Sequence, residues 1–181
     1  MLKLYLIRHG ETSYNADGNK YCGRTNVDLT EKGENQAKKL KVLLANIEFD
    51  AVYTSPLTRA FKTAQLAVPH TEIKTDDRLI ELDFGNWEGK TRKEFITENK
   101  LIWDRWNSDP VNNRAGECGE TAGELIERID SFINDILRTH HKGNILIVAH
   151  NGVNRFLMAH LLGFNPKNYR KIVQENSTLT L

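Results

Sequence analysis

The chain has 181 residues, a length that suits a single domain over residues 1–181 and leaves little room for a second. Its 25 Lys and Arg balance 24 Asp and Glu, so the net charge of +1 favours a small-molecule partner over a nucleic acid or a membrane surface. Two cysteines without CxxC spacing argue against a disulfide framework or a structural zinc. Because no apolar run approaches the ~20 residues of a spanning helix and no signal-peptide pattern is present, we expect a cytoplasmic protein.

The first predicted strand begins near Leu4 and ends abruptly in Arg8, His9 and Gly10. An apolar segment of this kind delivers its polar residues to the carboxyl end of a buried strand, where open α/β sheets bind their ligands. The polar stretch over residues 10–29 is too long for an ordinary connection. We therefore interpret it as an active-site loop.

Strand-like and helix-like segments alternate along the rest of the chain. The predicted elements are a helix from Thr30 to about 47, a strand at 51–54, a helix over 57–66 started by Ser55 and Pro56, an edge strand at 72–74, a loop at 78–89, a helical segment over 91–106, a long amphipathic helix over 121–140, a buried strand at 144–149, a helix over 152–162 and a last strand at 177–181. This alternation is typical of a three-layer α/β fold with a mainly parallel central sheet and helices on both faces.

Two of the buried strands end in histidine, His9 after the first and His150 after the strand at 144–149. Arg59 lies on the first turn of a helix that also follows a strand. The same edge of the sheet is therefore expected to gather imidazoles, guanidinium groups and helix amino termini. These groups suit the oxygens of a phosphate.

Several motifs resemble those of the histidine phosphatase superfamily, the phosphoglycerate mutase-like proteins. They stand in the same order and at similar spacing over nearly the whole chain: Arg8-His9-Gly10-Glu11-Thr12 with Asn15, Gly23 with the stretch Val27 to Gly33, Ser55 to Ala60 with Arg59, Leu79 to Gly89 with Glu81, and Val148 to Val153 with His150. Such a series of separate motifs in register is far more specific than the Arg-His-Gly tripeptide alone.

The resemblance implies a role for each matching residue. His9 would be the nucleophile that becomes a phosphohistidine, and Glu81 would be the proton donor. The remaining implied site residues are Arg8, Arg59 and His150, which would hold the phosphoryl group, and Asn15 and Gly23, which would contact the substrate. Asn151 departs from the family pattern, because a small residue usually follows the histidine there, and it is a further candidate contact to the phosphate. The attacking imidazole must be neutral, so its other nitrogen is expected to donate to a fixed acceptor such as a backbone carbonyl. No metal or cofactor is expected, because the cationic groups already neutralise a phosphate.

The resemblance favours the phosphatase branch over a mutase. Mutases of this superfamily carry an arginine directly after the proton donor, a double arginine before the second histidine motif, and a tail that covers the site. Here no arginine directly follows Glu81, no double arginine lies between Glu81 and His150, and the sequence ends at Leu181 without that tail. A phosphomonoesterase similar to α-ribazole phosphatases and broad-specificity phosphatases is thus the leading hypothesis. A phosphoglycerate mutase is the alternative, and an inactive phospho-ligand binding module is the third. Trp103 and Trp106 are as consistent with simple packing as with a wall of the substrate pocket.

Overall fold

A single five-stranded sheet forms the centre of the protein, and the computed structural model describes all residues from Met1 to Leu181. Its strands are β1 (Leu2–Arg8), β2 (Ala51–Thr54), β3 (Ile73–Thr75), β4 (Gly143–Ala149) and β5 (Leu179–Thr180), in the order β3-β2-β4-β1-β5. Every neighbouring pair is parallel except β1 and β5, which run antiparallel. The predicted three-layer fold with a mainly parallel sheet is confirmed, and each predicted strand is present within two residues of its expected ends.

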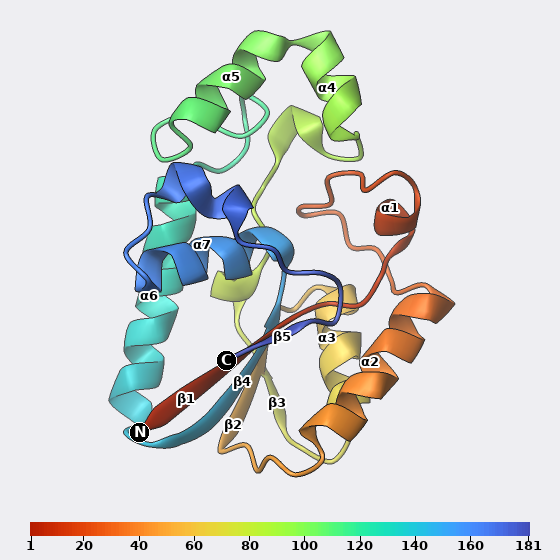
Figure 1. Cartoon of the computed structure of the whole chain (residues 1–181), viewed down its shortest axis with the longest axis vertical. Helices are drawn as coiled ribbons and strands as arrows, with labels where there is room; N and C mark the ends of the chain where they lie inside the picture. Colours follow the sequence, from red (N-terminus) through yellow and green to blue (C-terminus); the bar gives the residue numbers. More distant parts are fainter.

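Helices cover both faces of this sheet. The pair α2 (Glu31–Leu44) and α3 (Thr58–Ala67) lies on one face, and α6 (Ala122–Thr139) and α7 (Asn151–Leu161) lie on the other (Figure 1). Alternate residues of β4 enter the two cores, since Leu146 belongs to the cluster with α2 and α3 whereas Ile147 belongs to the cluster with α6 and α7. A strand buried on both faces has to be apolar, as β4 is over its buried part from Ile145 to Ala149.

The start of α3 differs from the prediction. Ser55 does not cap the helix, because the hydroxyl of Ser55 accepts a hydrogen bond from the amide of Leu57 at 3.3 Å and the helix begins only at Thr58. The free amide of Thr58 instead donates to the side chain of Asn26 at 2.8 Å. A residue 32 positions earlier in the chain thus supplies the cap, which a local pattern does not reveal.

The predicted helical segment over 91–106 consists of two helices, α4 (Arg92–Glu98) and α5 (Lys100–Ser108). Asn99 separates them with a non-helical backbone, and its side chain accepts a hydrogen bond from the amide of Ile102 at the start of α5. Both helices lie beyond the carboxyl ends of the strands (Figure 1). Trp103 and Trp106 are buried in the core and do not line the substrate cleft described below, so they serve packing.

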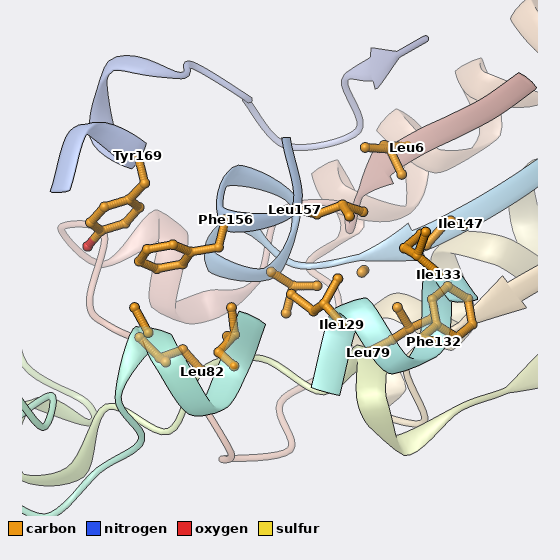
Figure 2. Packing of buried hydrophobic residues seen from close by; sticks show 14 of the residues in the cluster. Leu6, Leu79, Leu82, Ile129, Phe132, Ile133, Ile147, Phe156, Leu157 and Tyr169 are labelled. Carbon is orange, nitrogen blue, oxygen red and sulfur yellow. The ribbon is translucent and has the colours of Figure 1, made fainter. Parts of the chain in front are cut away.

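The carboxyl-terminal part of the chain packs back onto α7. The short helix η3 (Pro166–Lys171) places Tyr169 on Phe156 of α7, with ring centroids 4.1 Å apart in a stacked arrangement (Figure 2). Trp106 of α5 donates its indole N–H to the hydroxyl of Tyr169 at 3.3 Å. The sequence did not predict η3, nor the other short helices, which are α1 (Ser13–Ala16), η1 (Asp77–Leu79) and η2 (Gly85–Trp87).

Candidate active site

Sheet register brings the two predicted histidines together. Arg8, the last residue of β1, is paired with Ala149, the last residue of β4. His9 and His150 therefore leave adjacent parallel strands at the same level, and their ring centroids are 5.2 Å apart. These residues are 141 positions apart in the sequence, and they meet because β1 and β4 are neighbouring strands of the sheet.

A cleft of about 740 Å³ opens above this edge of the sheet. Five predicted site residues line it: Arg8, His9, Asn15, Glu81 and Asn151. The other three, Arg59, His150 and Gly23, are not among its lining residues.

The imidazole of His9 is held in one orientation. Its Nδ1 lies 2.7 Å from the carbonyl oxygen of Gly10. Since a carbonyl only accepts hydrogen bonds, Nδ1 carries the proton and Nε2 keeps its lone pair. Burial, together with the charges of Arg59 and Arg8, holds the pKa of His9 well below its usual value of 6.5. The ring is therefore a neutral base at physiological pH, as the sequence analysis expected.

Buried nitrogen atoms without hydrogen-bond partners lie near this imidazole. Both ring nitrogens of His150 and the Nε atoms of Arg8 and Arg59 are buried without a hydrogen-bond partner. Burial, together with the charges of Arg155 and Arg59, lowers the pKa of Arg8 to about 10. Burial with the charge of Arg59 holds the pKa of His150 well below 6.5. Leaving a buried polar group unpaired costs about 1–3 kcal/mol. Such a concentration of unpaired donors favours binding of an anion.

Arg59 also organises the loop that contains Cys22, Gly23 and Thr25. This fully buried side chain donates from Nη1 to the carbonyl of Thr25 at 2.9 Å and from Nη2 to the carbonyls of Cys22 and Gly23 at 3.2 and 2.8 Å. The amide of Gly23 donates to the carboxylate of Glu88, and a Cβ on Gly23 would lie 2.5 Å from the carbonyl oxygen of Leu82. In this structure Gly23 fixes the loop that holds Arg59.

Glu81 is bound to the amino terminus of α7. Its Oε1 accepts hydrogen bonds from the amides of Leu82 and Val153 at 2.9 and 3.1 Å, and its Oε2 accepts one from the amide of Gly152 at 3.0 Å. The side chain is only 3% exposed and lines the cleft. A carboxylate has about four lone-pair sites, so the three amides leave one free for a proton or a ligand.

The carboxyl-terminal segment contributes residues that sequence reasoning missed. Asn176 donates from Nδ2 to the carbonyl of His9 at 3.0 Å and to Oδ1 of Asn15 at 3.2 Å. Thr12 also donates to the same oxygen of Asn15, which leaves the Asn15 amide nitrogen without a partner on the lining of the cleft. Gln174 accepts a hydrogen bond from Arg8 through its carbonyl at 3.0 Å. The polar run before the last predicted strand was the only signal for these contacts.

Two further arginines in the cleft lie outside the motifs that the sequence analysis identified. Arg155 lies one turn after Asn151 on α7, and Arg170 lies on η3.

No group of three or more His, Cys, Asp or Glu side chains is arranged to hold a metal ion.

Known proteins share this sequence and fold. The profile of the histidine phosphatase superfamily (branch 1) matches residues 4–181. Phosphoserine phosphatase 1 of Hydrogenobacter thermophilus is 30% identical, and the match covers 100% of this chain and 86% of that protein. Adenosylcobalamin/alpha-ribazole phosphatase of Escherichia coli is 35% identical, and the match covers 90% of this chain and 80% of that protein. A crystal structure of a phosphoserine phosphatase mutant from Entamoeba histolytica, in complex with phosphoserine, superimposes with a TM-score of 0.90 at 28% identity, covering 99% of this chain and 89% of that one.

This chain belongs to the histidine phosphatase superfamily, branch 1. Within it, the protein is a phosphomonoester hydrolase, as the sequence analysis predicted. None of its helices combines the length and the apolarity that crossing a membrane would need.

Proposed function

We propose that this hydrolase transfers the phosphoryl group of a small phosphate ester to Nε2 of His9 and then to water. The observation that carries the proposal is the His9 imidazole itself. It faces the cleft, its Nδ1 is committed to the carbonyl of Gly10, and its low pKa keeps Nε2 unprotonated. An in-line attack from a fixed, neutral imidazole needs no separate base to activate it.

Arg8, Arg59 and His150 bind the phosphoryl oxygens in this proposal. Their unpartnered buried nitrogens supply hydrogen bonds that an incoming phosphate completes, and the two guanidinium charges oppose the charge of the transferring group. The dianion in turn favours a protonated His150, which would otherwise remain neutral. Asn15 and Asn151 add uncharged contacts from the rim of the cleft.

Glu81 acts as the proton donor in the first step. As the bond from Nε2 to phosphorus forms and the ester P–O bond breaks, its carboxyl group protonates the leaving oxygen. The resulting carboxylate returns to the amides at the start of α7. In the second step it accepts a proton from the water that attacks phosphorus, the P–N bond breaks, and inorganic phosphate leaves with His9 regenerated.

The substrate is a small phosphorylated metabolite. The relatives named for phosphoserine and alpha-ribazole phosphate support two candidate ester classes, one carrying a second anionic group and one carrying an aromatic base. The cationic lining of the cleft favours the first of these.

Phosphate release from a panel of esters tests the proposal. The panel contains sugar phosphates, phosphoglycerates, nucleotides, phosphoserine, α-ribazole phosphate and p-nitrophenyl phosphate, each with and without EDTA. We expect release that EDTA leaves unchanged, since the arginines neutralise the phosphate without a metal. Loss of release with EDTA would overturn this mechanism, and interconversion of 3- and 2-phosphoglycerate faster than release would favour a mutase.

A further inference from the structure

We propose that Arg155 and Arg170 form a second anion site, which binds a carboxylate of the substrate while the His9 pocket binds its phosphate. This inference rests on the proposed phosphatase function and names the substrate class: phosphate esters of small carboxylic acids. The His9 pocket alone explains recognition of the phosphoryl group, whereas Arg155 and Arg170 have no part in the phosphoryl-transfer steps.

Aromatic packing brings the two arginines to the same part of the cleft. Arg155 directly precedes Phe156, and Arg170 directly follows Tyr169. Phe156 and Tyr169 stack on each other (Figure 2), with ring centroids 4.1 Å apart, and this contact joins α7 to η3 next to both arginines in the chain. The charge of Arg170 and, more strongly, burial lower the pKa of Arg155, which agrees with two guanidinium groups held close together.

No carboxylate of the protein neutralises this pair. Neither Arg155 nor Arg170 forms a salt bridge, and the Nε atoms of both are buried without a hydrogen-bond partner. Arg170 is fixed by stacking on the ring of Trp103 at 4.4 Å and by donating to the hydroxyl of Tyr21 at 3.0 Å. A rigid guanidinium with an unsatisfied donor is prepared for a bidentate anion such as a carboxylate.

The charge of the whole cleft agrees with a substrate that carries two anionic groups. Seven Lys and Arg side chains line it against three carboxylates. Of these carboxylates, Glu11 is already paired with Lys32 and Glu81 is held by backbone amides. A single phosphate at the His9 pocket would leave the opposite part of the cleft with an excess of positive charge.

The spacing along α7 suits a short substrate. Asn151 and Arg155 both line the cleft and lie one helical turn apart, about 6 Å along the axis. Asn151 is next to His150, and the charge of Arg155 acts on Arg8, so the second anion site lies beside the His9 pocket, at about this distance along the helix. A phosphate ester of a two- or three-carbon acid spans it without a further binding group.

O-phosphoserine and O-phosphoethanolamine provide the test, because they differ only in the carboxylate. We expect kcat/KM of the unaltered enzyme to be at least about tenfold higher for phosphoserine, the effect of one charge-assisted hydrogen-bonded pair. Arg155→Gln and Arg170→Gln should each remove most of that preference and raise KM for phosphoserine. Arg155→Lys, which keeps the charge, should restore part of it.

Hydrolysis of p-nitrophenyl phosphate reports on the phosphoryl-transfer machinery in every variant, and Arg138→Gln on the exposed surface of α6 serves as the matched control. We expect p-nitrophenyl phosphate turnover within about threefold of the unaltered enzyme in all of them. Equal activity on the two amino alcohol phosphates, or equal losses on both in the Arg155 and Arg170 variants, would overturn the second site while leaving the phosphatase intact. No turnover of any ester would overturn the proposed function itself.

Discussion

Replacing Glu81 by glutamine separates its proposed role as proton donor from its role as a hydrogen-bond acceptor at the amino terminus of α7. The glutamine oxygen can keep the two hydrogen bonds that Oε1 accepts from Leu82 and Val153. Its NH2 group would then face the amide of Gly152, which now donates to Oε2 at 3.0 Å. One buried donor loses its partner, so we expect the free energy of unfolding to fall by about 1–3 kcal/mol.

The catalytic effect of Glu81→Gln should depend on the leaving group. Alkoxide leaving groups need a proton, so kcat/KM for phosphoserine should fall by about 100- to 10,000-fold. Nitrophenolate leaves without help, so hydrolysis of p-nitrophenyl phosphate should fall far less. Steady-state kinetics on both esters measure the difference, and denaturant unfolding measures the stability. Glu124→Gln is the control, because Glu124 fills a similar place at the amino terminus of α6, outside the cleft. Equal slowing on both esters would refute the proton-donor role.

Three more predictions concern stability and positioning. Because His9 and His150 have lowered pKa values in the folded protein, the unfolded chain binds more protons below pH 6.5. The free energy of unfolding should therefore fall as the pH drops from 7 to 5, by at most about 1.4 kcal/mol per pH unit for each histidine. Denaturant titrations at each pH measure this fall, and His150→Gln should make it smaller. Gly152→Ala would place a Cβ 2.6 Å from the Glu81 carboxylate and should slow phosphoserine hydrolysis more than that of p-nitrophenyl phosphate; equal rates to the unaltered enzyme would show that Glu81 need not stay at α7. Phe156→Ala removes the ring stacked on Tyr169 and should lower the free energy of unfolding by about 3–5 kcal/mol, whereas a loss below about 1 kcal/mol would contradict the packing described.

The sequence predicted those parts of the site that lie at the ends of strongly apolar strands. His9 and His150 could be placed because Leu4 to Ile7 of β1 and Ile145 to Ala149 of β4 are apolar runs and parallel strands end at the same edge. The neutral state of His9 and its contact with a backbone carbonyl also followed from the chemistry that a nucleophilic imidazole needs.

Contacts between distant segments could not be predicted in this way. The cap of α3 comes from Asn26, and no local pattern connects that residue to Thr58. Arg155 and Arg170 line the same cleft, and the elements that carry them are joined by the stacking of Phe156 on Tyr169, a tertiary contact with no periodic signal in the sequence. Asn176 likewise reaches Asn15 only because the chain returns to the edge of β1.

Trapping the phosphorylated enzyme tests the central claim most directly. Rapid acid-free quenching during turnover of a radiolabelled ester, followed by proteolysis and mass spectrometry, identifies the residue that carries the label. We predict an acid-labile, base-stable phosphoryl group on His9, formed at least as fast as phosphate is released and absent from His9→Ala, which should also lose turnover. Phosphate release without any labelled intermediate, a label on another residue, or full activity of His9→Ala would contradict the account.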